Sequence, residues 1–300
     1  MAQARAEYVL TLSCPDRTGI VHAVAAYLHQ AGCNVLDSQQ FGDRTDQGSA
    51  RFFMRVHVET VQAEAGPGTP VTYDSLYGGF AAVAAEFGME WELHDTAVQP
   101  RVLIMVSKAG HCLNDLLYRR AAESLRIDVP LVVGNHPDLA ALAAAHGVPF
   151  ECVPAGAPGD ELAAQRSEGR LLDLVSELSI DFVVLARYMR ILSPELCAKM
   201  AGRVINIHHS FLPSFKGARP YHQAHAHGVK LIGATAHYVT PDLDEGPIIE
   251  QEVARVDHAD SPEDLAAIGR DAERVALARA VRWHAEHRVL LHGRRTVIFR

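Results

Sequence analysis

The feature that most constrains the fold is a series of short apolar segments separated by helical stretches in the last two thirds of the chain. These segments lie at residues 102–106, 131–133, 150–153, 182–185 and 204–207. Nearly every position in them is apolar, which is typical of parallel strands buried on both faces, and the stretches between them have helical spacing. We therefore expect an α/β domain with a Rossmann-like, mostly parallel sheet that helices cover on both sides.

The first ninety-odd residues follow a different pattern. The alternation of apolar and polar residues predicts strands at 8–12, 35–41, 51–58 and 89–93. Helical spacing predicts helices at 20–28 and 73–86, and glycine and proline predict a loop over 60–72. This βαββαβ order matches a ferredoxin-like sandwich. We predict two domains, residues 1–95 and residues 96–300.

Charge and composition exclude several classes of function. The chain has 300 residues, with 28 Lys and Arg against 36 Asp and Glu, and a net charge of −8 gives no electrostatic argument for a nucleic-acid or membrane partner. No apolar run reaches the ~18 residues of a membrane span. The five cysteines form no C-x-x-C pair, so we expect reduced thiols rather than disulfides. We predict a cytoplasmic protein that acts on a small molecule.

Polar residues at one predicted strand end point to a site. Asn206 and His208 lie where the segment 204–207 ends, and a second polar loop, 240–247, contains Asp244. Ligands of open α/β sheets bind at the carboxyl ends of the strands. An amide donor, an imidazole and a carboxylate together suit attack on a carbonyl-like carbon. On spacing alone, an Asn-x-His at a strand end is more often structural.

The rival interpretation of the many histidines is a metal site. The chain has 17 histidines, and His222 and His225 lie three apart on a predicted helix, where His237 and Asp244 could complete a hydrolytic zinc site. No H-E-x-x-H or comparable compact signature is present. We predict no metal and no cofactor.

Longer motifs resemble a known family. Residues 206–217 (NIHHSFLPSFKG) and 243–249 (LDEGPII) resemble the active-site signature of the folate-dependent formyltransferase superfamily, and residues 185–195 and 217–224 are similar to its deformylase branch. Residues 7–94 resemble an ACT regulatory domain, so the resemblance covers nearly the whole chain. It implies a hydrolase that converts 10-formyltetrahydrofolate to tetrahydrofolate and formate, which supplies formate for purine biosynthesis and balances one-carbon folate pools.

The resemblance also implies residue roles. Asn206 would hold the formyl oxygen, His208 would act as acid and base or stabilise the tetrahedral intermediate, and Asp244 would organise proton transfer involving water. The residues expected to clasp the pterin of the folate substrate, largely through their backbone, are Met189, Arg190, Ile191, Leu192, Val239 and Thr240.

The acceptor side departs from the superfamily's transferases. Residues 107–114 (SKAGHCLN) replace the glycine- and serine-rich turn that cradles a phosphate in glycinamide ribonucleotide transformylases. Our hypothesis is that Lys108 and His111 close this side and leave room for water. Two alternatives stay open: a formyltransferase to an amine acceptor, and a non-catalytic folate or amino-acid sensor.

Residues 14–20 and 31–35 resemble the effector region of ACT domains. The residues predicted to bind an amino-acid effector are Asp16, Gly19, Gly32 and Asn34. The same residues also suit turns and helix ends in a domain that only dimerises through paired sheets. We expect a homo-oligomer and favour a tetramer.

Overall fold

The structure is a computed structural model that describes residues 5–44, 50–61, 71–157, 159–212 and 220–300. Parts of the predicted loop at 60–72, and of the motifs at 206–217 and 217–224, lie outside the described residues. Contacts divide the chain into two compact units. The first contains residues 1–98, 286–290 and 297–300, and the second contains residues 99–285 and 291–296. The predicted limits, 1–95 and 96–300, place all the C-terminal residues in the second domain.

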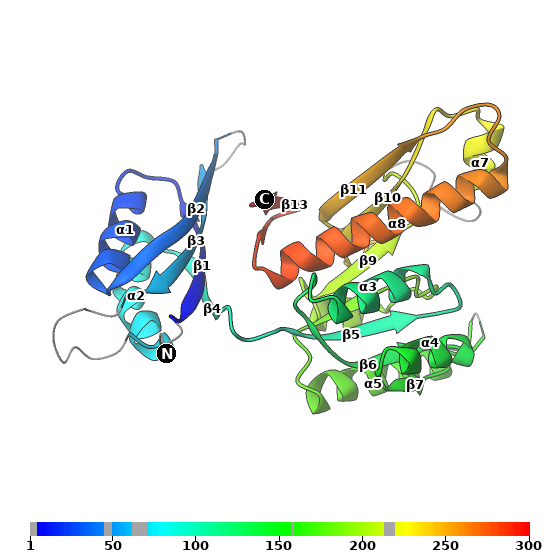
Figure 1. The fold of residues 1–300 in the computed structure, drawn as a ribbon, viewed down its shortest axis with the longest axis horizontal. Helices are drawn as coiled ribbons and strands as arrows, with labels where there is room; N and C mark the ends of the chain where they lie inside the picture. The colour runs from blue at the N-terminus through cyan, green and yellow to red at the C-terminus, as the bar shows by residue number, and fades with distance from the viewer. Residues whose placement is uncertain (1–4, 45–49, 62–70, 158, 213–219) are drawn as a thin grey trace. The chain divides into compact units, whose positions relative to one another are not determined.

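The first unit is a four-stranded antiparallel sheet with two helices (Figure 1). Its elements are β1 (Glu7–Pro15), α1 (Ile20–Gln30), β2 (Cys33–Asp43), β3 (Arg51–Thr60), α2 (Tyr73–Phe87) and β4 (Glu90–Asp95). The strand order β2-β3-β1-β4 is that of the predicted βαββαβ sandwich.

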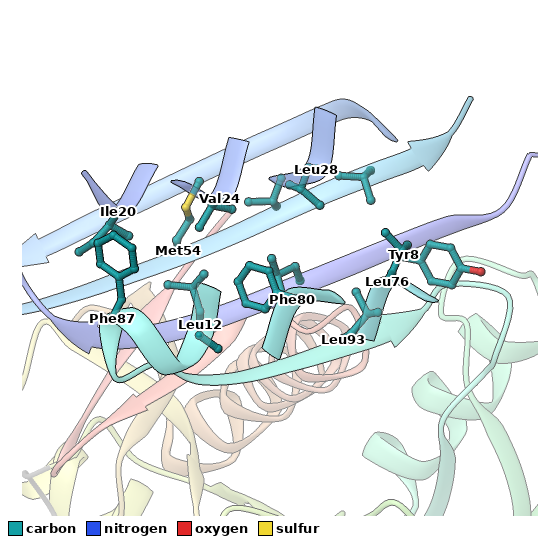
Figure 2. Close-up of a cluster of buried hydrophobic side chains, with 14 of the residues drawn as sticks. Tyr8, Leu12, Ile20, Val24, Leu28, Met54, Leu76, Phe80, Phe87 and Leu93 are labelled. Carbon is teal, nitrogen blue, oxygen red and sulfur yellow. The ribbon is translucent and has the colours of Figure 1, made fainter. Parts of the chain in front are cut away.

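The core of this unit forms where the two helices pack on one face of the sheet (Figure 2). Ile20, Val24 and Leu28 recur at helical spacing along α1, and each is at most 2% exposed. Phe80 of α2 and Leu12 of β1 meet them in the same apolar cluster. Burying one such side chain stabilises the fold by about 1.5–3 kcal/mol, so the periodicity of the sequence is sufficient to fix which helix faces turn inward.

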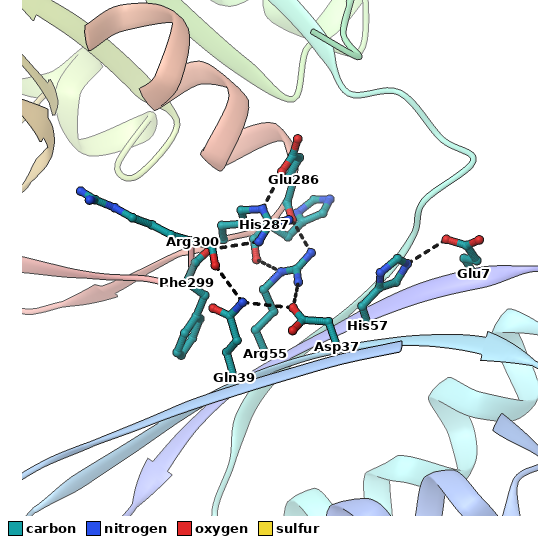
Figure 3. Close-up of polar contacts among 10 residues, drawn as sticks. Glu7, Asp37, Gln39, Arg55, His57, Glu286, His287, Phe299 and Arg300 are labelled. Atoms are coloured by element: carbon teal, nitrogen blue, oxygen red, sulfur yellow. Dashed lines mark hydrogen bonds and ion pairs between the residues drawn. The ribbon is translucent and has the colours of Figure 1, made fainter. Parts of the chain in front are cut away.

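The end of the chain packs with the first unit through Arg55 of β3 (Figure 3). The Arg55 side chain is 4% exposed. It donates from Nη2 to the carbonyl of Glu286 at 3.1 Å and from Nε to the carbonyl of His287 at 3.2 Å, and Nη1 donates to Asp37 at 3.3 Å. Burial lowers the pKa of Arg55 to about 10, so it remains a cation at neutral pH. Nothing local in the sequence predicts the contacts with Glu286 and His287, because they join residues more than 200 positions apart.

The second unit is built on a seven-stranded sheet (Figure 1). Its elements are β5 (Arg101–Val106), α3 (His111–Ala121), β6 (Asp128–Gly134), η1 (Pro137–Leu139), α4 (Ala140–Ala145), β7 (Phe150–Cys152), α5 (Glu161–Glu177), β8 (Phe182–Leu185), α6 (Pro194–Lys199), β9 (Val204–His208), α7 (Pro220–Ala226), β10 (Leu231–Tyr238), β11 (Ile248–Arg255) and α8 (Pro262–Ala285). Two short strands, β12 (Val289–His292) and β13 (Arg295–Ile298), follow α8.

The sheet is mostly parallel, as the apolar segments predict. Its order is β11-β10-β9-β8-β5-β6-β7, and only β10 runs against its neighbours. Leu103 and Met105 pack toward α5 and α6 on one face, whereas α3 and α8 contact each other on the opposite side of the layer. This arrangement confirms the predicted α/β class and brings the carboxyl ends of β5, β8 and β9 to one edge.

The long helix α8 is capped at its start by Ser261 and Asp264. Ser261 Oγ accepts the backbone N–H of Asp264 at 3.2 Å, and the Asp264 carboxylate accepts the backbone N–H of Ser261 at 3.0 Å. This reciprocal cap satisfies two donors of the first turn. In the part of the chain that the structure describes, neither α8 nor any other helix is long and apolar enough to cross a bilayer.

Candidate active site

A pocket of about 260 Å³ opens at the carboxyl ends of β8 and β9. The segments 185–192, 206–209 and 239–244 supply most of its wall, together with Cys197 and His237. Residues 239–247 form the loop that joins β10 to its antiparallel neighbour β11, and this loop supplies Asp244 to the wall. Three segments that are distant in sequence therefore meet at the sheet edge where ligands of such folds bind.

Asp244 is the carboxylate of the pocket. Its Oδ2 lies 3.3 Å from His208 Nδ1 and its Oδ1 lies 3.7 Å from His237 Nε2. Burial would raise the pKa of the Asp244 carboxyl, but hydrogen bonds and charge from the two imidazoles hold it well below its usual range. Asp244 is therefore ionised at neutral pH. It fixes the Nδ1 side of His208 and stabilises that ring when it carries a proton.

His208 presents its other nitrogen without a partner. The residue is 6% exposed, and His208 Nε2 is buried and makes no hydrogen bond to any described residue. With Nδ1 held by Asp244, Nε2 is the atom that can accept or give a proton in the pocket. Burying a ring nitrogen without a hydrogen-bond partner costs free energy. A substrate or water molecule bound in the pocket would supply that partner.

His237 orients both neighbours of His208. It is 2% exposed, and its Nδ1 donates to the Tyr238 carbonyl at 2.9 Å. Nε2 is then available to accept from Asn206 Nδ2, which lies 3.3 Å away. One N–H of the Asn206 amide is thereby engaged, and the second can be directed to a ligand oxygen. The sequence favoured His237 only as a neighbour of the site, because its contacts arise from the pairing of β9 with β10.

Gly246 allows the Asp244 loop to lie against β10. A Cβ at this position would overlap the carbonyl oxygen of Tyr238. Asp244 itself has a φ of 55°, in the left-handed region that costs free energy for most side chains and is better tolerated by Asp. The loop therefore combines a close backbone approach at Gly246 with a strained backbone conformation at Asp244.

The residues predicted to clasp the pterin all line this pocket: Met189, Arg190, Ile191, Leu192, Val239 and Thr240. Met189 and Ile191 are 58% and 74% exposed, so they offer apolar surface at its mouth. The backbone N–H of Met189 donates to Ser107 Oγ at 2.9 Å, and Arg190 donates to the Ala155 carbonyl at 2.7 Å. These bonds hold the segment that follows β8 in place.

The two residues predicted on the acceptor side lie elsewhere. Lys108 is exposed, and neither Lys108 nor His111 belongs to the described pocket lining. His111 opens α3, and its Nε2 donates to Glu273 of α8 at 2.8 Å.

Glu273 is the centre of a second polar cluster, which we call the Glu273 cluster and which contains Glu273, His111, Tyr221 and Arg187. The Glu273 carboxylate is 1% exposed and also accepts from Tyr221 Oη at 3.0 Å, and Arg187 Nε lies 3.4 Å from it. Burial raises the pKa of Glu273, but these donors and cations lower it overall, so it stays ionised. Gly269, one turn earlier on α8, lacks the Cβ that would overlap the Tyr221 ring.

The described residues offer little support for a metal site. One group of close ligand atoms is present among them, His111, Cys112 and Glu273. Burial raises the pKa of the Cys112 thiol far above its usual range, which opposes the thiolate that a metal needs, and Glu273 is already neutralised by Arg187. His222 and His225, the rival ligands from the sequence, are exposed on α7.

The predicted effector residues form two separate pairs in the first unit. Asp16 and Gly19 precede α1, whereas Gly32 and Asn34 follow it, and an 11-residue helix separates them by about 16 Å. Asn34 Nδ2 donates to Glu59 at 3.0 Å. Within one chain these four residues do not come together.

Comparisons with known proteins identify the family of this chain. The formyl transferase family model matches residues 100–281, and the ACT domain model matches residues 8–65. Formyltetrahydrofolate deformylase from Corynebacterium sp. (strain P-1) is 47% identical over 293 residues, which cover 98% of both chains. The chain belongs to the formyltetrahydrofolate deformylase family.

Solved structures of the deformylase family support the same assignment. The family member from Burkholderia mallei aligns with a TM-score of 0.89 and 51% identity over 98% of this chain and 100% of its own. Glycinamide ribonucleotide transformylase 1 from Symbiobacterium toebii aligns with a TM-score of 0.62 and 30% identity, and covers 70% of this chain and 98% of its own. The transformylase fold thus accounts for only part of the chain.

Proposed function

We propose that this protein hydrolyses 10-formyltetrahydrofolate to tetrahydrofolate and formate. The observation that carries the proposal is the meeting of Asn206, His208 and Asp244 in one pocket, in a chain that matches deformylases over almost its whole length. The resulting formate would supply purine biosynthesis and adjust the one-carbon folate pools.

The geometry suits an addition followed by an elimination. The oxygen of a water molecule forms a bond to the formyl carbon while a proton leaves that water, and the carbonyl electron pair moves onto the formyl oxygen. Asn206 Nδ2–H is placed to donate to this oxygen, since its other N–H is engaged by His237. The bond from carbon to N10 then breaks, its electron pair returns to nitrogen, and nitrogen takes up a proton.

His208 is the proposed carrier of these protons. Its free Nε2 can accept the proton of water and later protonate the leaving nitrogen, and Asp244 stabilises the imidazolium formed between the two steps. Each step is served by side chains of the pocket, so we propose that turnover needs no cofactor. The wall formed by residues 189–192 and 239–240 would receive the planar pterin through backbone groups and apolar contacts.

Formate release from 10-formyltetrahydrofolate tests the proposal directly. We expect purified protein to release formate at the same rate with and without a chelator. Glycinamide ribonucleotide in excess separates hydrolysis from transfer, because formyl transfer comparable with formate release would instead support the amine-acceptor alternative. Substrate binding without any formate release would support the sensor alternative.

The remaining features of the proposal concern setting and regulation. We propose a cytoplasmic homo-oligomer, with a tetramer favoured, in which the ACT domain binds an amino-acid effector. The described part of the chain contains five free cysteines, four of them buried, which suits a reducing compartment. Because the predicted effector residues form pairs at opposite ends of α1, a complete effector site would need residues of two chains. Calorimetric titration with glycine and methionine tests this.

A further inference from the structure

Arg187 is the feature of the pocket that the proposed mechanism leaves unused. It lines the pocket, its side chain is 17% exposed, and its Nε and Nη1 atoms are buried without a hydrogen bond to any described residue. Glu273 lies 3.4 Å from Nε, so the guanidinium has a counter-charge but not a full set of acceptors. A buried donor that stays unsatisfied in a native structure requires an explanation, and an anionic ligand would supply the missing acceptors.

The backbone of Arg187 is also unusual. Five described residues other than glycine have a positive φ. Three of them, Glu123, Ser179 and His287, each lie two positions beyond the last residue of a helix, where the left-handed conformation is an ordinary way to end the helix. The other two are Asp244 and Arg187, with φ of 55° and 65°, and both line the pocket. Strain retained away from helix ends is an indication of function.

Arg187 follows β8, the strand that lies beside Asn206 and His208. Leu185 of β8 pairs with Asn206 of β9 in parallel, so the positions two residues further along are Arg187 and His208. The adjacent His209 has its pKa lowered to about 4 by burial, by Arg187 and by His208, and it is neutral at pH 7. The other arginine of the lining, Arg190, donates to the Ala155 carbonyl. Of the two arginines in the pocket lining, Arg187 is therefore the one that has Nε and Nη1 without an acceptor among the described residues.

We propose that Arg187 binds the carboxylate product of the reaction, formate, and that Glu273 weakens this binding enough for release. The inference rests on the proposed function. Hydrolysis converts a neutral formyl group into an anion, because the second oxygen arrives with water and the acid formed loses its proton at neutral pH. The ionised Asp244 in the same pocket repels that anion, and a guanidinium offset by one buried carboxylate compensates for the repulsion.

Direct titration of the ligand-free protein with ¹³C-formate, followed by NMR, tests the site without turnover. We expect Arg187→Met to raise the Kd of formate at least tenfold. Arg170→Gln is the control, since Arg170 pairs with Glu151 and Glu177 in the second unit but does not line the pocket, and we expect it to change Kd less than twofold. An unchanged Kd in folded Arg187→Met overturns the proposal. Because formate is titrated directly, this result is independent of whether the protein hydrolyses formylfolate.

Glu273→Gln is expected to lower the Kd of formate, whereas Arg187→Met is expected to raise it. It retains the size of the side chain and an oxygen for Tyr221 but removes the charge that competes for Arg187, so we expect formate to bind several-fold more tightly. A merely structural cluster predicts weaker binding in both variants. If Glu273→Gln does not fold, Arg187→Lys decides: it keeps the cation, and we expect it to bind formate more tightly than Arg187→Met does.

The glutamyl tail of a folate is a second source of carboxylate. Binding of pteroylglutamate and of pteroate, which lacks the tail, is therefore compared in the natural protein and in Arg187→Met. We expect the variant to bind both ligands with the same relative affinity as the natural protein. A loss confined to pteroylglutamate, with formate unaffected, would show that Arg187 serves the tail and would overturn the proposal.

Discussion

Asp244 and Glu273 are two ionised carboxylates of the second unit, each paired with histidine, and they differ in what encloses them. Asp244 has a side chain that is 15% exposed, contacts two imidazoles and faces the pocket. Glu273 is 1% exposed and is enclosed by His111, Tyr221 and Arg187. The same acid–imidazole pair can thus transfer protons where a ligand reaches it, and can hold other residues in place where none does.

We expect the two carboxylates to affect different properties of the protein: Asp244 its catalytic activity, and Glu273 the stability of its folded state. Removing Asp244 leaves two imidazoles, which can be neutral, whereas removing Glu273 leaves the permanently charged and largely buried guanidinium of Arg187 without its counter-charge. We therefore expect the two sites to respond differently to the same kind of substitution.

The largest expected effect is on stability at Glu273. Glu273→Leu leaves Arg187 buried and unpaired, and we expect it to lower the free energy of unfolding by about 3–5 kcal/mol. Urea unfolding measures this loss. The control is Glu195→Leu, which removes a solvent-exposed ion pair with Lys199 and should change the free energy of unfolding far less than Glu273→Leu does. Equal losses in the two variants would contradict the role assigned to the Glu273 cluster.

The next effect is on turnover at Asn206 and Asp244. Asn206→Ala removes the donor to the formyl oxygen, and we expect kcat to fall by a factor on the order of 10²–10³. Asp244→Asn, which keeps the shape of the side chain but not its charge, should be at least as severe. Formate release gives kcat, and the thermal midpoint reports folding. Near-normal kcat in either folded variant would refute the assignment.

A smaller effect is expected at His237, which positions Asn206 and Asp244 without contacting the reacting atoms. His237→Gln loses the pairing with Asn206 Nδ2 at 3.3 Å, and we expect kcat to fall by about tenfold, the equivalent of one hydrogen bond. KM should change much less, because the pterin contacts remain. A change confined to KM would instead place His237 among the binding residues.

The smallest effect concerns pH and His209. Its pKa in the folded protein is lowered to about 4 from an ordinary value near 6.5, so the folded state favours the neutral ring. The unfolded chain takes up this proton first as pH falls, and the contribution to stability is complete above pH 6.5 and is lost progressively toward pH 4. His209→Gln should flatten the dependence of unfolding free energy on pH in this window. An unchanged slope would contradict the shift.

The fold was predictable because local patterns determine it. Apolar strands alternating with helices specify a covered parallel sheet, and the ends of its strands share one edge, so Asn206 and His208 were expected there. Asp244 was expected from the polar loop 240–247, and the family resemblance added its role and the pterin wall. The comparisons confirm the family, the fold class and the hydrolase function. The individual site assignments stay predictions, although the pocket contains most of those residues.

The Glu273 cluster could not be predicted, because its members meet only through tertiary packing. Glu273 lies within a 24-residue helix, where a charged residue ordinarily marks the solvent face. The one local signal is Gly269, since glycine inside a helix costs about 1 kcal/mol relative to alanine and so indicates a close neighbour. The partner, Tyr221, comes from a separate helix whose packing on α8 no periodicity reveals.

The contact of Gly246 with β10 has a consequence for anyone redesigning this protein toward other formyl donors. The position carries no reacting group, yet any side chain there would collide with the Tyr238 carbonyl and push the Asp244 loop away from His208. A library that diversifies the loop for new substrates must therefore leave residue 246 untouched. The freedom available for redesign lies instead at the mouth, in Met189 and Ile191, whose side chains are largely exposed.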